Sequence, residues 1–139
     1  MSKNYRIKKV NNLPALAEIY NKNTKQMIGL IIYDKMLRYQ TGNQVQGEHF
    51  INNKNEDVIV ITINNHFKKL FDTQPNIFEG LVMHEIGHLV NGDFTKDKNN
   101  DAIRGTAILN HNVDIKEIKA DQFAVEEIGK NRFIQFLEW

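Results

Sequence analysis

The sequence predicts an α+β fold in which a small mixed sheet packs against two helices. Three observations support this prediction. The run Val58–Ile63 is rich in β-branched residues and is typical of a buried strand. Apolar residues recur at helical spacing over residues 77–90. A second helical pattern spans residues 114–128 and ends at a glycine.

Length and composition narrow the class of protein. The chain has 139 residues, which suits one domain spanning residues 1–139. It is 41% hydrophobic and 25% charged, and its net charge of +1 indicates no nucleic-acid or membrane-surface partner. Cysteine is absent, so any metal must be held by histidines and carboxylates. No segment resembles a membrane span or a signal peptide, which predicts a cytoplasmic protein.

The first third of the chain gives the weakest pattern. Residues 1–12 are polar and basic and support no firm assignment. Leu13–Asn21 is predicted to be a helix, with Asn12 as its N-cap and Pro14 in its first turn. Residues 25–39 are compatible with a buried strand or a long helix, and Gly29 with its β-branched neighbours favours the strand.

The middle of the chain alternates turns with short elements. Residues 40–57 are rich in turn formers and leave room for a short strand around residues 48–51. The strand Val58–Ile63 follows, and its edge could hold an extended peptide. Phe67–Phe71 is predicted to form a helical turn.

The central helix is predicted to begin at Asn76, where Glu79 completes a capping box, and to run to about Asn91. Its apolar stripe consists of Ile77, Leu81, Val82, Ile86, Leu89 and Val90. Gly92 suits the left-handed position just after a helix.

The last part of the chain begins with a predicted loop over residues 93–112, with an ordered piece near 103–109. Asp114 is the expected N-cap of a helix that runs to about Ile128. The apolar positions of this helix are Ile115, Ile118, Phe123, Ala124 and Ile128. Asn131 is expected to cap a last short helix, whose inward residues are Phe133, Phe136 and Leu137, with Trp139 closing the core.

The central helix contains an H-E-x-x-H motif, formed by His84-Glu85-Ile86-Gly87-His88. Side chains four residues apart lie on one face of a helix, so both imidazoles can reach one metal ion. Glu85 can then reach a water molecule on that ion. This is the chemistry of a zinc hydrolase.

Two histidines are not enough, because catalytic zinc usually has three protein ligands. The extension H-E-x-x-H-x-x-G-x-x-H is excluded, since positions 91 and 94 are Asn91 and Phe94. Glu117, in the first turn of the next long helix, is the candidate third ligand. Asp121 lies four residues later on the same face and is the candidate partner for the other ring nitrogen of His84.

Other interpretations of these positions remain open. Glu117 could instead form a capping box with Asp114, although the following Asp121 favours the ligand role. Small side chains at Ala120 and Ala124 would let the two helices approach closely. Asp93, just past the central helix, is more consistent with a cap or loop hydrogen bond than with a ligand.

The motifs H-E-x-x-H-x-x-N-G-D at His84–Asp93 and E-x-x-A-D at Glu117–Asp121 resemble those of the gluzincin metallopeptidases. They are most similar to the HtpX-like branch, and the ImmA/IrrE-type peptidases of mobile elements share a related pattern. The likeness covers roughly residues 58–139, and the lack of membrane spans makes a soluble minigluzincin the better match.

This resemblance implies a zincin-like fold and hydrolysis of a peptide or protein substrate. It implies that His84, His88 and Glu117 bind Zn²⁺ and that Glu85 is the general base. His111 is the foremost candidate for stabilising the oxyanion, beside Arg104 and Tyr33. An alternative function is a regulatory or latent zincin-fold protein of a mobile element that binds or cleaves one partner. A purely structural metal site is a third hypothesis, and it requires a fourth protein ligand.

Overall fold

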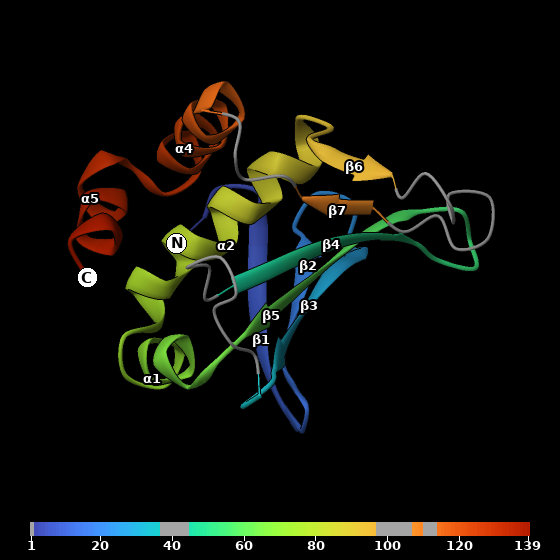
Figure 1. The fold of residues 1–139 in the computed structure, drawn as a ribbon, viewed down its shortest axis with the longest axis horizontal. Helices are drawn as coiled ribbons and strands as arrows, with labels where there is room; N and C mark the ends of the chain where they lie inside the picture. Colours follow the sequence, from blue (N-terminus) through green and yellow to red (C-terminus); the bar gives the residue numbers. More distant parts are fainter. Residues whose placement is uncertain (1, 37–44, 97–106, 110–113) are drawn as a thin grey trace.

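A computed structural model of the chain describes residues 2–36, 45–96, 107–109 and 114–139 (Figure 1). The first half of the chain contains β1 (Tyr5–Asn12), β2 (Ala15–Asn21), β3 (Met27–Tyr33), β4 (Val45–Ile51) and β5 (Asp57–Ile63). The second half contains α1 (Asn65–Thr73), α2 (Pro75–Val90), β6 (Phe94–Lys96), β7 (Ala107–Leu109), α4 (Asp114–Ile128) and α5 (Lys130–Glu138).

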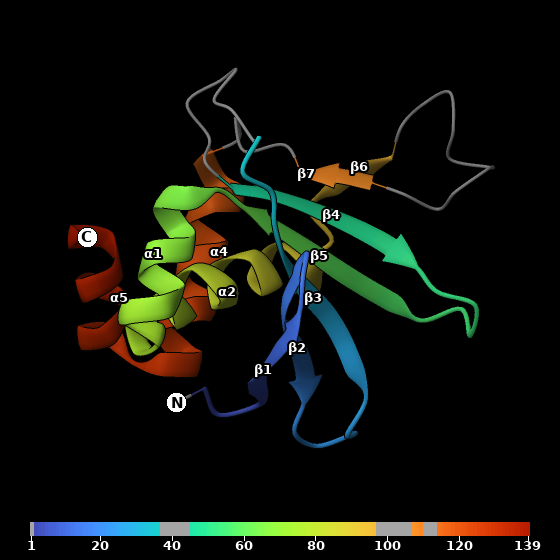
Figure 2. The same ribbon diagram turned by 90° about the horizontal axis from the view of Figure 1, so that it is seen from below.

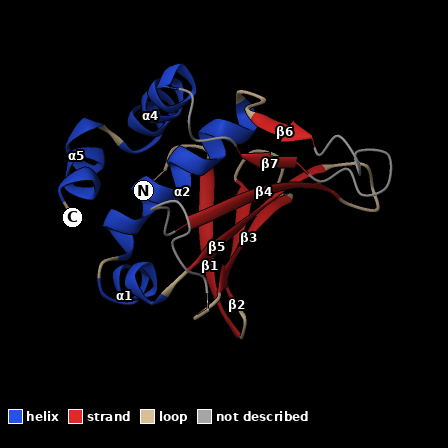
Figure 3. Cartoon of the chain, in the orientation of Figure 1, coloured by secondary structure: helices blue, strands red, loops and turns tan. Residues whose placement is uncertain are grey.

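The strands form one mixed sheet with the order β1-β2-β3-β5-β4-β7-β6. β3 and β5 are parallel, and the other neighbouring strands are antiparallel. The helices gather on one side of this sheet (Figure 3). The predicted α+β class with a mixed sheet is therefore confirmed, although the sheet of the described residues has seven strands and is not small. The predicted peptide-binding edge of Val58–Ile63 is wrong, because β5 is paired on both sides by β3 and β4.

The core lies between the sheet and α2. Ile59, Ile61 and Ile63 alternate along β5 and are fully buried on the face that the helices cover. α4 and α5 pack against the other side of α2, which therefore lies between the sheet and these two helices (Figures 1 and 2). Because α2 is covered on two sides, residues outside the predicted stripe, such as Phe78 and Met83, are buried as well.

The predicted helix at Leu13–Asn21 is wrong. Leu13 and Pro14 form the turn between β1 and β2, and the following residues form β2. Ala17 and Ile19 are fully buried two residues apart, which is the period of a strand. The favoured strand assignment within residues 25–39 is confirmed by β3, and the short strand near residues 48–51 is confirmed as part of β4.

Several predicted helix ends are shifted. The capping box at Asn76 is wrong, because α2 begins at Pro75, where a missing N–H has no consequence, and Gln74 is its N-cap. The last short helix begins at Lys130 and its N-cap is Gly129, so the predicted N-cap at Asn131 is wrong. The helical turn at Phe67–Phe71 is confirmed within α1, whose N-cap Asn64 accepts hydrogen bonds from two backbone N–H groups.

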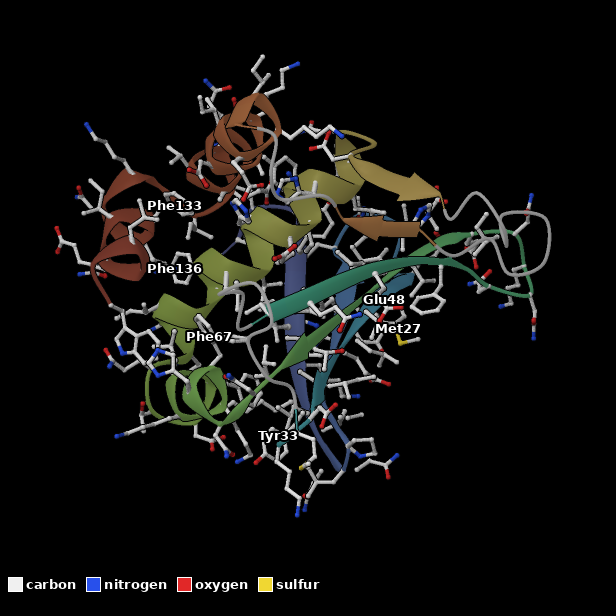
Figure 4. The ribbon with its side chains drawn as sticks, in the orientation of Figure 1. Met27, Tyr33, Glu48, Phe67, Phe133 and Phe136 are labelled. Carbon is white, nitrogen blue, oxygen red and sulfur yellow. The ribbon has the colours of Figure 1, made fainter. Side chains whose placement is uncertain are left out.

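Five residues predicted at apolar or buried positions are exposed. Ile115 and Ile118 of α4 are 65% and 56% exposed. Val90 is 56% exposed and Leu137 is 60% exposed, each in the last turn of its helix. Trp139 is 39% exposed and packs on the rings of His66 and Phe67 rather than closing the core. In contrast, Phe133 and Phe136 lie on the side of α5 that faces α2 (Figure 4).

None of the described helices is both long and apolar enough to cross a lipid bilayer.

Candidate metal centre

The two histidines of α2 meet a carboxylate from α4. The Nε2 atoms of His84 and His88 lie 3.1 Å apart. Glu117 Oε1 lies 3.4 Å from His84 Nε2, and Glu117 Oε2 lies 2.5 Å from His88 Nε2. These three side chains offer ligand atoms that all lie within 4.8 Å of one another, and the group could hold a metal ion. We call this group the metal centre.

Close packing of α2 against α4 brings the carboxylate of Glu117 near the two histidines. A Cβ atom added to Gly87 would lie only 3.1 Å from the Cα atom and from the carbonyl oxygen of Ala120. Ala120 and Ala124 are fully buried, so small residues stand on the α4 side of the helix contact. Glu117 lies one helical turn before Ala120, and the helix contact therefore sets how far its carboxylate extends towards the histidines.

Each imidazole is held by a carboxylate at its other ring nitrogen. His84 Nδ1 lies 2.7 Å from Asp121 Oδ1, and His88 Nδ1 lies 2.9 Å from Asp93 Oδ2. An ionised carboxylate can only accept hydrogen bonds, so each Nδ1 donates, and a neutral ring then has its lone pair on Nε2. Neutral rings would bring two lone pairs to 3.1 Å from each other, an arrangement that a cation between them would stabilise.

The separation of the two imidazoles matches that expected around a tetrahedral ion. Zinc–nitrogen bonds of about 2.05 Å in a tetrahedral site place neighbouring ligand atoms about 3.3 Å apart. The two Nε2 atoms, 3.1 Å apart, lie near that value. Glu117 presents a different oxygen to each histidine, at 3.4 Å from His84 and at 2.5 Å from His88, so its carboxylate would have to shift for one oxygen to bind the same ion. The donor set therefore fits a divalent ion such as zinc.

The local charge favours a cation. Burial lowers the pKa of the His84 imidazole, but the hydrogen bond to Asp121 and the negative charges of Glu85, Glu117 and Asp121 raise this pKa above its ordinary value. Glu85 is only 2% exposed and His88 is fully buried. Negative charge thus surrounds the two imidazoles, and the ring of His88 is shielded from solvent.

Comparisons with protein-family models, curated proteins and solved structures found no match to this chain. The likeness to gluzincin peptidases therefore rests on the two motifs and on the geometry of the metal centre, and it stays a prediction.

The side chains of the metal centre and their partners differ in exposure. The side chain of His88 is fully buried and that of Asp93 is 8% exposed. On the α4 side, Glu117 is 31% exposed and Asp121 is 42% exposed. Within the described residues, the carboxylates of α4 are thus more exposed than the His88 side of the centre.

The predicted oxyanion group is not located. His111 and Arg104 lie outside the described residues. Tyr33 is not part of the metal centre, because its hydroxyl group donates a hydrogen bond to Asn65 at the start of α1, and it lies far from α4 (Figure 4). The competing capping role of Glu117 is disfavoured, since both of its carboxylate oxygens face the histidines.

Asp93 is the site residue whose role the sequence interpretation missed. The sequence predicts a loop or cap hydrogen bond for Asp93, whereas its side chain contacts His88, a residue of the candidate metal centre. The spacing of these residues could have indicated this role. A glycine four residues after His88 marks a helix end, and the next residue, Asp93, folds back over that histidine.

Proposed function

We propose that this chain is a zinc-dependent peptidase of the gluzincin type with a zincin-like fold, acting on peptide or protein substrates. The convergence of His84, His88 and Glu117, with Glu85 buried beside them, is the observation that carries the proposal. Three protein ligands leave one position of a tetrahedral ion for water, as in catalytic zinc sites. Asp93 and Asp121 contact the outer ring nitrogens, which argues against their use as the fourth ligand of a structural site.

The residues have separate roles in this proposal. His84 and His88 would hold zinc through Nε2, and Glu117 would hold it through its carboxylate. When bound, zinc would supply an acidified water molecule and polarise the scissile carbonyl. A carboxylate oxygen of Glu85 accepts the proton of the attacking water and then delivers it to the leaving amine nitrogen. Asp121 and Asp93 keep the imidazoles oriented throughout.

The alternative function, a regulatory or latent protein of a mobile element, has no structural observation of its own. Within residues 2–36, β1, β2 and β3 belong to the same sheet as β5, so the first third of the chain is built into the fold. This alternative and the cytoplasmic location therefore stay predictions.

The test compares the wild-type chain with Glu85→Gln, which keeps the shape of the side chain and removes its basicity. Metal analysis should find one zinc ion per chain in both proteins. Cleavage of unfolded casein and of a fluorogenic peptide library should be at least about 100-fold slower in Glu85→Gln, the usual contribution of a general base. A wild type that binds no zinc, or equal cleavage by both proteins, would contradict the proposal. Zinc binding with cleavage of a single partner only would favour the regulatory alternative.

A further inference from the structure

The end of α2 is built as a Schellman motif. Asn91 is the C-cap, and Gly92 follows it with a φ of +71°. The Gly92 N–H donates to the Leu89 carbonyl at 3.1 Å, and the Asp93 N–H donates to the His88 carbonyl at 2.9 Å. These are the two hydrogen bonds that define the motif. The motif folds the second residue after the cap, Asp93, back over the third-last helical residue, His88.

The two residues brought together by this motif are unusual. Schellman motifs are frequently accompanied by an apolar contact at these two positions. Here the contact is between the Asp93 carboxylate and the His88 imidazole, whose Oδ2 and Nδ1 atoms are 2.9 Å apart. The same two residues are thus joined twice, once through the backbone and once through their side chains. Because the imidazole is fully buried and the carboxylate is 8% exposed, water competes little for this contact.

We propose that Asp93 is the positioning residue for His88. The left-handed Gly92 that ends α2, which we call the helix stop, holds Asp93 in place. The inference rests on the proposed zinc centre and adds a residue that acts through a ligand. By accepting the Nδ1 proton, the Asp93 carboxylate fixes the orientation of the His88 ring, with Nε2 facing His84 Nε2 and Glu117. Without that acceptor, the neutral ring can carry its proton on Nε2, which removes one metal ligand.

The two histidines are therefore oriented by different parts of the fold. Asp121, the partner of His84, belongs to α4, and its position depends on how α4 packs against α2. Asp93 lies just past the end of the helix that carries His88, and its backbone N–H donates back to that helix. The partner of His88 is therefore close to it in the chain, whereas the partner of His84 is supplied by tertiary packing.

The test uses ¹⁵N-histidine-labelled, metal-free protein, in which long-range ¹H–¹⁵N spectra report which ring nitrogen of each histidine is protonated. In the wild type, Nδ1 of His88 should be protonated. In Asp93→Asn the amide can donate to Nδ1, so the proton should shift towards Nε2. Zinc affinity, measured by competition with a chelating dye, should fall about 10- to 100-fold.

A pair of glycine variants tests the helix stop without touching Asp93. Gly92→Ala strains a left-handed residue, and its new Cβ would contact nothing within 4 Å. Gly129→Ala is the matched control, since it also has a positive φ of +90° and an equally open surrounding, but it lies between α4 and α5. Zinc affinity should fall in Gly92→Ala and stay unchanged in Gly129→Ala.

Each outcome bears on one claim. If Asp93→Asn keeps the wild-type His88 proton position and zinc affinity while the wild type binds zinc and cleaves peptides, this inference is overturned and the proposed function stands. If the wild type binds no zinc, the proposed function fails, and the proton position in metal-free Asp93→Asn still decides the role of Asp93. Equal losses of zinc affinity in the two glycine variants would refute the role of the helix stop. If Asp93→Asn does not fold, the glycine pair decides.

Discussion

Replacing Gly87 with alanine should weaken metal binding through a residue that is not a ligand. The new Cβ would lie 3.1 Å from the Cα atom and the carbonyl oxygen of Ala120, and 3.1 Å from the Cβ atom of Phe123. Ordinary contacts of this kind begin at 3.4 Å, so α4 would have to move away from α2 by a few tenths of an ångström. Two of these three contacts are with backbone atoms, which cannot rotate aside.

The expected free-energy change combines two opposing effects. Alanine favours a helix interior over glycine by about 1 kcal/mol. Overpacking of a tight contact typically destabilises by about 1–3 kcal/mol. The free energy of unfolding of metal-free Gly87→Ala should therefore fall by about 1 kcal/mol. Because α4 carries Glu117 and Asp121, the same shift should weaken zinc binding about tenfold, as expected when supporting geometry loosens by a fraction of an ångström.

Gly80→Ala on the same helix is the matched control. Its Cβ would lie 2.6 Å from the Cβ atom and 2.8 Å from the Cγ atom of Phe136, on the side of α2 that faces α5. The free energy of unfolding of this variant, measured in urea, should fall at least as much as that of Gly87→Ala. Its zinc affinity should stay unchanged, because the contact that it disturbs is with α5, which carries none of the ligands that we assign. Two results would refute the reasoning: wild-type zinc affinity in Gly87→Ala, or an equal loss of zinc affinity in Gly80→Ala.

Two further predictions concern the buried carboxylate at the end of α4. Glu127→Gln should lower the free energy of unfolding by about 1–3 kcal/mol in urea titrations, because the carboxylate accepts hydrogen bonds from the Ser2 hydroxyl at 2.6 Å and from the Asn4 side chain at 2.6 Å; an unchanged midpoint would contradict this role. Burial and the negative charge of Glu127 raise the pKa of the Tyr5 phenol above its ordinary value, so the contribution of this group to stability is complete below about pH 10 and is lost as the pH rises through the raised pKa. Across this pH range, the melting temperature should therefore fall less steeply in Tyr5→Phe than in the wild type. Parallel falls in the melting temperatures of the two proteins would contradict this prediction.

Features that depend on neighbours in the sequence could be predicted from it. His84 and His88 lie on one face of α2 because four residues make about one turn of a helix. Gly92 was expected in the left-handed position after α2, and its φ is +71°. A composition without cysteine limited the ligands to histidines and carboxylates. Each of these inferences needs only local geometry or composition.

The wrong assignment at residues 13–21 shows where local patterns fail. Leu13, Leu16 and Tyr20 recur at helical spacing, whereas the buried pair Ala17 and Ile19 recurs at strand spacing. Pairing of β2 with β1 and β3 selects the strand. Those partners lie elsewhere in the chain, and tertiary pairing overrides a weak local preference.

The sequence by itself determined that a helix carries two histidines and a glutamate, and that two acidic residues share a face further along the chain. Only the tertiary structure decided that Glu117 lies 2.5 Å from His88 and that Asp121 contacts His84. The physical reason is that the contact of Gly87 with Ala120, between helices far apart in the chain, sets the distance from α2 to α4. A helical repeat specifies which face a side chain occupies, and packing between helices specifies what that face meets.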